Sequence, residues 1–423
     1  MLKLRRQVFI LLAIFISIHS LSQNEANIWY FQKNCGLDFN NGEPLILNDG
    51  QIESGMANVT IADLNGDYLF SCEWSRIYSS AGIMENGSGL LSPGLSGRAI
   101  VKWPDQQYLY YIFTAVNPNH PNPGLNYCIV DISANNGLGS VIEKNIPIAI
   151  GWDASDRVAI IKKENSNNVW LIIRKNIEDS YAVFLIDENG IYLNPIISPM
   201  PDREPNWESI QGFIKISYNK KFLFANFGNQ FEICQFNAKT GLVNYLYSIG
   251  PVDPQYQGIR GYEFSPDSKY LYVNYINLIG DSNKIYQFDM SMINDSNSFI
   301  NSHIYIGIGS ANALQLARDG KIYCTPNPYL PETYLYYISV INKPWIHGVG
   351  SGFESNAINL FPNQAGWTLP NILIDYLLRF EWTGEPCQGY PIHFKPNFIP
   401  TPQTIQWDFD DGPGSTSWQL SPT

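Results

Sequence analysis

The side chains best suited to chemistry in this chain are acidic residues near predicted turns, and their spacing favours structure over a metal site. Asp63, Asn65 and Asp67 are spaced like the beginning of a calcium-binding loop. Such a loop also needs a bidentate Glu at its last position, where this chain has Trp74. The same residues between two apolar runs are typical of a hairpin turn. We therefore expect no metal and no cofactor, with calcium at this turn as the alternative.

Nucleophilic catalysis finds little support among the other candidates. The G-x-S-x-G motif is missing, and Ser351 has the wrong spacing for it. No histidine after the N-terminal segment is spaced four residues from another His or Glu, as in a helical zinc motif; these histidines are His120, His303, His347 and His393. Adjacent carboxylates such as Glu178 and Asp179 are typical of solvated turns. We expect a protein that is not an enzyme, with a hydrolase or lyase of extracellular polysaccharide as the alternative.

The N-terminus has the three regions of a secretory signal peptide. Lys3, Arg5 and Arg6 form a basic start, and residues 8–18 are almost all apolar. Small residues before residue 23 provide a cleavage site, so we expect residues 1–22 to be removed. The apolar run is shorter than the roughly 20 residues that span a membrane, which argues against an N-terminal anchor. We expect a secreted or outer-surface protein with no membrane insertion after signal removal.

The predicted mature chain is strongly acidic. Removal of the signal would leave 23 of the 26 basic residues against 38 acidic ones, a net charge of −15. This charge argues against nucleic acid as a partner. The six cysteines include no C-x-x-C pair, which argues against zinc and dithiol redox sites. Four of them lie in predicted strands, where we expect burial as small apolar residues and leave disulfide pairing open; they are Cys72, Cys128, Cys234 and Cys324.

A recurring hairpin predicts the architecture. In Gly261–Val273, β-branched and aromatic residues flank the turn Ser265-Pro-Asp-Ser268, where Pro and Asp favour a tight reversal. Similar turns are centred near residues 65, 105, 166, 219, 267 and 319, about 40 to 60 residues apart, which is the repeat length of propeller blades. Further strands follow each hairpin, so we predict an all-β protein, a β-propeller of four-stranded blades; a β-sandwich is the alternative.

The number of blades depends on how the ends of the repeat region pair. Strand-like residues remain at Trp29–Phe31 and Leu369–Tyr376, and their pairing would close the ring and protect its edges. Seven blades follow if these segments form a blade of their own, which we favour, and six if they complete another. Asn34–Phe39 is predicted as a loop, and Tyr334–Ile341 as a strand.

The residues after the repeats change in character. We predict a propeller over residues 23–380, a linker over 381–389 and a further β-unit over 390–423. Cys387, Gly389 and the segment Trp407–Gly412 resemble the first half of a PKD domain, an Ig-like β-sandwich with the signature W-D-F-G-D-G. Asp410 replaces a Gly of that signature. The resemblance implies a partial PKD domain that acts as a spacer.

The repeat region also resembles a family. Segments such as Asp63–Phe70, Phe264–Asp267, Asp319–Tyr323 and Leu369–Asn371 are similar to the N-terminal propeller of PKD-domain-containing surface proteins of gliding bacteria. This resemblance implies export, often by the type IX route. It also implies a role in adhesion or surface recognition.

Candidate ligand contacts lie in long loops rich in aromatic and amide side chains. Loops on a rigid scaffold commonly carry binding function, and we single out His120, Trp207, Tyr256 and Tyr329 as candidate contacts. An extracellular protein or carbohydrate is the expected ligand. The alternative is that these loops are stiff connectors whose aromatic rings pack back on the blades. The sequence indicates no oligomeric state.

Overall fold

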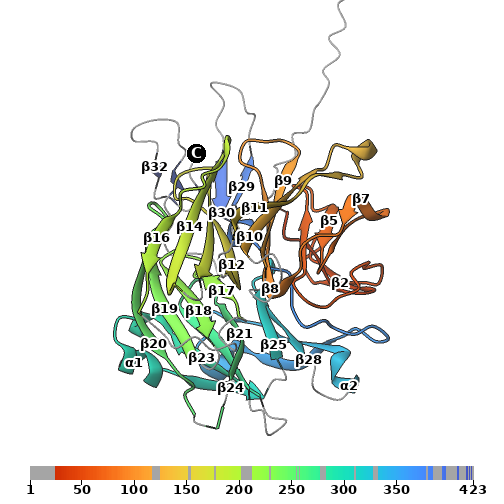
Figure 1. Cartoon of the computed structure of the whole chain (residues 1–423). Coiled ribbons are helices and arrows are strands. Elements are labelled where there is room, and N and C mark those ends of the chain that lie inside the picture. The colour runs from red at the N-terminus through yellow and green to blue at the C-terminus, as the bar shows by residue number, and fades with distance from the viewer. Residues whose placement is uncertain are drawn as a thin grey trace, which may run out of the picture.

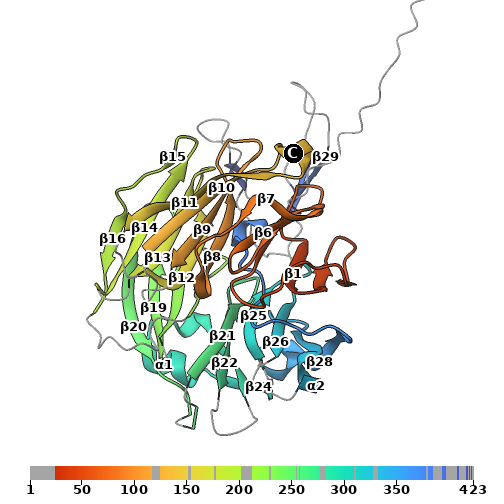
Figure 2. The same cartoon turned by 45° about the vertical axis from the view of Figure 1, so that its right-hand side comes forward.

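The sheets of the protein are arranged around a ring in the computed structural model (Figure 1, and turned by 45° in Figure 2). This arrangement confirms the all-β, propeller-like prediction. The structure describes residues 24–377 except 117–123, 151–153, 176–177, 202–211, 228–229, 254, 257, 277–282, 309–310 and 327–331; beyond these it describes 380–383, 393–396, 407–408, 416–417, 419 and 421. The predicted signal peptide lies outside these residues. No helix in the described ranges is long and apolar enough to cross a membrane.

Six sheets of three or more strands form the ring, and we number them in chain order. Sheet 1 contains β1 (Ile28–Gln32), β2 (Cys35–Asp38) and β3 (Leu45–Leu47). Sheet 2 contains β4 (Val59–Ala62), β5 (Tyr68–Cys72), β6 (Arg76–Ser79), β7 (Gly82–Ser88), β8 (Pro93–Lys102), β9 (Leu109–Val116), β10 (Gly124–Asp131) and β11 (Ser140–Ile150). Sheet 3 contains β12 (Ala154–Lys162), β13 (Val169–Lys175), β14 (Ser180–Asp187), β15 (Gly190–Ile191) and β16 (Ile196–Pro199).

The other three sheets have four strands each, in chain order from the inside outward. Sheet 4 contains β17 (Ile214–Ile216), β18 (Phe222–Phe227), β19 (Gln230–Phe236) and β20 (Val243–Ile249). Sheet 5 contains β21 (Gly258–Phe264), β22 (Tyr270–Ile276), β23 (Lys284–Asp289) and β24 (Ile304–Ile308). Sheet 6 contains β25 (Ala311–Leu316), β26 (Ile322–Pro326), β27 (Tyr337–Ile341) and β28 (Phe353–Asn359). The short helices are η1 (Asn135–Gly137), η3 (Met290–Met292), α1 (Ser296–Asn301), α2 (Glu332–Leu335), η4 (Gly348–Ser351) and η5 (Ile374–Tyr376).

The predicted hairpins are confirmed, and their turns are held by side chains. In the turn between β21 and β22, the Ser265 hydroxyl donates to Asp267 at 2.7 Å and accepts the Tyr270 N–H at 2.9 Å. The turn between β17 and β18 repeats this pattern with Ser217 and Asn219. The two turns also touch, because the Asn219 N–H donates to the Ser268 hydroxyl at 3.0 Å. These short connections therefore gather on one face of the ring, which we call the turn face.

The number of separate sheets corrects the predicted blade count of seven or six. Five sheets have four or more strands, and sheet 1 has only three. Sheet 2 is continuous because β7 and β11, the outer strands of two four-stranded groups, pair in parallel through Glu85 and Ser140. This pairing joins two strand edges that would otherwise be open.

Three local predictions are also wrong. Cys35–Asp38 forms strand β2 rather than a loop, because its backbone pairs with both β1 and β3. The beginning of the predicted strand Tyr334–Ile341 belongs to helix α2. Residues 369–373 have no strand assignment, and η5 follows them. The hydrophobic pattern marked these segments as apolar without distinguishing a strand from a buried connector.

The ring is closed by contacts between its first and last segments. The N–H groups of Trp367 and Thr368 both donate to the Gly55 carbonyl, at 2.9 and 3.0 Å. The β1 strand packs with sheet 6 in one buried apolar cluster that includes Trp29, Phe31, Tyr323 and Ile338. Segments about 300 residues apart thus hold each other, which is how a circular sheet protein avoids open ends.

The larger apolar core lies between the sheets. Side chains from all the sheets after the first enter one cluster, among them the fully buried Ile161, Leu171, Phe224 and Phe264. Each such side chain contributes roughly 1.5–3 kcal/mol when removed from water. The cysteines of the described ranges are free thiols and buried, which confirms the prediction for the four strand cysteines; Cys387 lies outside those ranges.

Two short antiparallel pairs follow the ring. β29 (Phe380–Thr383) pairs with β30 (His393–Pro396), and β31 (Trp407–Asp408) pairs with β32 (Thr416–Ser417). Residues 381–383 of the predicted linker are therefore part of a strand. The PKD interpretation of residues 390–423 stays a prediction.

Candidate site in the central channel

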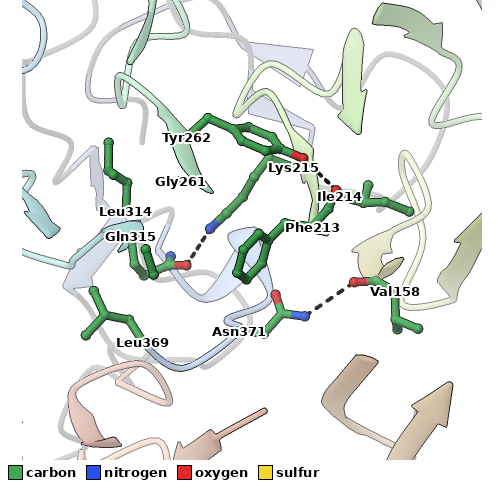
Figure 3. Close-up of a pocket in the computed structure, with 11 residues that line it drawn as sticks. Val158, Phe213, Ile214, Lys215, Gly261, Tyr262, Leu314, Gln315, Leu369 and Asn371 are labelled. Atoms are coloured by element: carbon green, nitrogen blue, oxygen red, sulfur yellow. Dashed lines mark hydrogen bonds between the residues drawn. The ribbon is translucent and has the colours of Figure 1, made fainter. Parts of the chain in front are cut away.

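A small cavity lies in the middle of the ring, where the inner strands of sheets 3 to 6 meet (Figure 3). Its volume is about 20 Å³, and Val158, Lys215, Tyr262, Gln315 and Asn371 are among its lining residues. A water molecule needs at least ~10–15 Å³, so the cavity has room for one small molecule of that size. Ligand sites usually enclose ~300–1,000 Å³. This channel is therefore nearly filled by the protein itself.

Three polar side chains meet at the edge of this cavity. Lys215 on β17, Glu263 on β21 and Gln315 on β25 come from the inner strands of three successive sheets. The Lys215 ammonium nitrogen lies 2.8 Å from Glu263 Oε2. It also lies 2.6 Å from Gln315 Oε1 (Figure 3). We call these three residues the channel triad. The Lys215 side chain is 14% exposed and that of Glu263 2% exposed, so both charges are largely removed from water.

The Glu263 carboxylate is held from several sides. It accepts the Phe264 N–H at 2.9 Å and the Leu316 N–H at 3.2 Å, and the Tyr218 hydroxyl lies 3.4 Å away. Burial, together with the nearby Glu263 charge, raises the pKa of Tyr218 well above its ordinary value. The Tyr218 phenol therefore stays protonated, and its hydroxyl donates to the Glu263 carboxylate. Glu263 has a fixed orientation as a result.

Neutral groups complete the cavity wall. The Tyr262 hydroxyl donates to the Phe213 carbonyl at 2.5 Å. The Asn371 amide donates to the Arg98 carbonyl at 3.0 Å. It also donates to the Val158 carbonyl at 3.3 Å (Figure 3). Asn371 belongs to residues 367–377, the last segment of the ring, which we call the closing segment. This segment therefore forms part of the cavity wall.

Helix η5 lies at the turn face, beside sheets 3 and 4. The Asp375 carboxylate accepts the Lys162 N–H at 2.9 Å and pairs with the Lys220 ammonium group. Tyr376 and Leu377 are buried in the main core beside it. Lys162 is the last residue of β12, and Lys220 lies in the turn that follows β17, so these contacts anchor η5 to the turn-face ends of sheets 3 and 4.

A second buried charge cluster joins sheets 3 and 4 away from the cavity. The Arg174 guanidinium contacts both oxygens of Glu232, at 3.0 and 3.3 Å, and Asp179 at 2.7 Å. The Tyr181 hydroxyl donates to the same Glu232 carboxylate at 2.7 Å. The guanidinium carbons of Arg157 and Arg174 lie 3.9 and 5.0 Å from the centre of the Phe227 ring. We call Arg174, Glu232, Asp179 and Tyr181 the arginine cluster. Its charges satisfy one another in the interior.

One of the four predicted ligand contacts lies in the described ranges. Tyr256 is buried, with 2% of its surface exposed, and its ring packs 6.0 Å from that of Tyr275. It therefore offers no surface to a ligand, in agreement with the alternative that loop aromatics pack back on the blades. The other three contacts lie outside the described residues; they are His120, Trp207 and Tyr329.

The candidate calcium turn acts as a hairpin turn. One oxygen of Asp63 accepts the N–H groups of Asn65 and Asp67, at 2.8 and 2.9 Å. These bonds are typical of an Asp that stabilises its own turn. No group of three or more potential metal-binding side chains occurs among the residues that the structure describes.

Sequence reasoning missed both charge clusters, although the channel triad had a detectable signal. Each triad residue precedes the first residue of its turn by two positions, and each interrupts an apolar inner strand. A polar residue at the same place in three successive repeats indicates a shared interior contact. The arginine cluster had no such repeat signal, because its members come from different positions in their blades.

Comparison with known proteins yields remote similarity alone. No protein-family model and no curated protein matches the sequence. A Bacteroides fragilis protein with a provisional 6-phosphogluconolactonase name superposes with a TM-score of 0.46 at 12% identity, over 82% of this chain and 98% of that one. The periplasmic gluconolactonase of Pseudomonas aeruginosa gives 0.42 at 10% identity, over 74% and 90% of the two chains. A functionally unknown protein of Desulfotomaculum acetoxidans gives 0.43 at 14%, over 82% and 99%. At these values we take neither activity nor substrate from them.

Proposed function

We propose that this protein is an exported, non-enzymatic surface protein that binds an extracellular protein or glycan with the loops of its propeller. The observation that carries the proposal is the filled channel. Its cavity measures about 20 Å³, and its one cationic lining group, Lys215, is engaged by Glu263 and Gln315. In a propeller whose centre is filled, a large partner would have to bind to the loops.

The scaffold in this proposal is the ring of sheets followed by a PKD spacer. The bonds of Trp367 and Thr368 to Gly55, and the packing of β1 against sheet 6, support a closed ring.

The binding residues in this proposal are His120, Trp207 and Tyr329. Aromatic rings give large contact areas at low entropic cost, which suits both glycan and protein ligands. Tyr256 is left out because its ring is buried. It provides the matched control instead, since Tyr256→Phe changes a buried aromatic residue without changing the exposed surface.

A glycan array and a pull-down from extracellular material, both with the mature chain, test this function. We expect a saturable ligand whose binding falls at least about tenfold when His120, Trp207 and Tyr329 are together replaced by Ala, because such contacts concentrate the binding energy. Tyr256→Phe should bind like the unmodified protein. Turnover of a polysaccharide or lactone without stable binding would contradict the proposal.

A further inference from the structure

The channel triad brings an amine, an amide and a carboxylate together in the interior. Lys215 Nζ lies 2.6 Å from the amide oxygen of Gln315 and 2.8 Å from Glu263 Oε2. We propose that Lys215 and Gln315 become joined by an isopeptide bond, with Glu263 as the group that carries the protons. This site is independent of the proposed ligand-binding function.

The reaction balances without any further reagent. Lys215 Nζ gives a proton to Glu263, and the neutral amine attacks the Gln315 side-chain carbonyl carbon. The bond from Nζ to this carbon forms, and the bond from the carbon to Nε2 breaks. Glu263 passes the two protons lost by Nζ to the departing nitrogen, which leaves as ammonium. The products are one secondary amide and one ammonium ion, and Glu263 is again a carboxylate.

The position of the triad favours this step in three ways. The side chains lie on the inner strands β17, β21 and β25, so their reacting groups are held close without a cost in orientation. Gln315 and Glu263 are buried, which limits competing hydrolysis by water. The cavity beside Lys215 and Gln315 holds about 20 Å³, which is space for one departing molecule the size of water or ammonia.

Other contacts keep the reacting groups in place. Glu263 is oriented by the N–H groups of Phe264 and Leu316. The Gln315 amide nitrogen donates to the Leu316 carbonyl at 3.1 Å, so the leaving group points away from Lys215 Nζ while the carbonyl oxygen faces it.

The bond would act as a covalent link across the ring. Lys215 and Gln315 are 100 residues apart and lie in sheets 4 and 6, on either side of sheet 5. A link between distant residues restricts the unfolded chain, as a disulfide does. In a chain whose cysteines are free thiols wherever the structure describes them, this is an alternative way to fix the ring.

Peptide mapping of the full mature protein tests the proposal. Trypsin does not cleave after an acylated lysine, so the linked protein should yield one branched peptide that joins residues 204–220 to residues 285–318. Its mass should be about 17 Da below the sum of the two peptides, the mass of one ammonia. Cyclisation of an N-terminal glutamine at residue 23 would also release one ammonia. It would change the mass of a different peptide, so it cannot be mistaken for the branched peptide.

Two variants separate the bond from simple pairing. Lys215→Arg keeps a cation beside Glu263 but cannot form the link under the same conditions, and it serves as the control for folding. Glu263→Gln removes the proton carrier, and we expect the branched peptide to fall at least tenfold in abundance. Recovery of the two separate peptides, cleaved after Lys215, from the unmodified folded protein would overturn the proposal. An undiminished branched peptide in folded Glu263→Gln would overturn the role of Glu263.

Discussion

The arginine cluster and the channel triad perform the same structural task with different chemistry. Both place a cation and a carboxylate between neighbouring sheets, where the charges are largely hidden from water. The Arg174 guanidinium is always protonated and binds Glu232 through a rigid fork, so it can only pair. Lys215 instead has a primary amine, which faces an amide as well as a carboxylate. The comparison shows that two buried ion pairs with similar packing can differ in whether a covalent step is open to them.

The strongest test of the arginine cluster is Arg174→Met. This change leaves Glu232 buried without its main cation, and we expect a loss of about 3–5 kcal/mol in the free energy of unfolding. Denaturant titration of the mature chain measures it. The free energy of unfolding of Arg174→Lys should lie between those of the unmodified protein and Arg174→Met. A lysine keeps the positive charge but loses the two-pronged contact of the guanidinium with the carboxylate.

The control for this measurement is Arg76→Met, which removes an ion pair at the surface. Arg76 and Glu53 form a 2.7 Å pair, but their side chains are 40% and 56% exposed. Water screens such a pair, so we expect no measurable change. Equal losses from Arg76→Met and Arg174→Met would contradict the importance given to burial.

Tyr181→Phe tests a smaller part of the same cluster. The change removes a 2.7 Å hydrogen bond to Glu232 but leaves Arg174 in place. We expect a loss of about 1.5–3 kcal/mol, the usual range for a hydrogen bond to a charged group. Urea unfolding of Tyr181→Phe and Arg174→Met shows which variant loses more of the free energy of unfolding. A larger loss in Tyr181→Phe would show that the phenol, rather than the guanidinium, holds the carboxylate.

A pH series on Glu25→Gln tests a carboxylate that lacks this kind of support. Burial raises the pKa of Glu25 above its ordinary value of 4.5, although Lys162 and Lys102 oppose the shift. The folded protein therefore binds this proton more tightly than the unfolded chain. Its contribution is fully present below pH 4.5 and is lost as the pH rises through the folded-state pKa. Glu25→Gln should gain stability relative to the unmodified protein across that rise; a constant difference would contradict it.

Among the changes at buried groups, the smallest effect is expected for Tyr275→Phe. The Tyr275 hydroxyl is buried and has no hydrogen-bond partner among the described residues. Removing an unpaired polar atom eliminates a desolvation cost, so stability should stay the same or rise by up to about 1 kcal/mol. Thermal unfolding measures the change. A loss comparable to Tyr181→Phe would mean that the two phenols play the same role.

The repeating hairpins could be predicted from the sequence because each turn is stabilised by residues within the turn itself. Ser265 and Asp267 hold their turn through local hydrogen bonds, so the pattern is visible in four consecutive residues. The closing segment could not be predicted in this way, since Trp367 and Thr368 bond to Gly55 without forming a regular strand. The burial of Tyr256 was missed for a similar reason, because loop residues have no period that reveals their orientation. The triad depends on contacts between repeats, which only alignment of Lys215, Glu263 and Gln315 across the blades could suggest.

We propose that the interior of this propeller holds the ring together and that its loops bind the ligand. The most direct test compares ligand affinity and unfolding midpoint in Lys215→Arg and in the combined replacement of His120, Trp207 and Tyr329 by Ala. We predict that Lys215→Arg lowers the midpoint at unchanged affinity, and that the loop variant loses at least about tenfold in affinity at an unchanged midpoint. Loss of binding in folded Lys215→Arg, with full binding by the loop variant, would contradict the account.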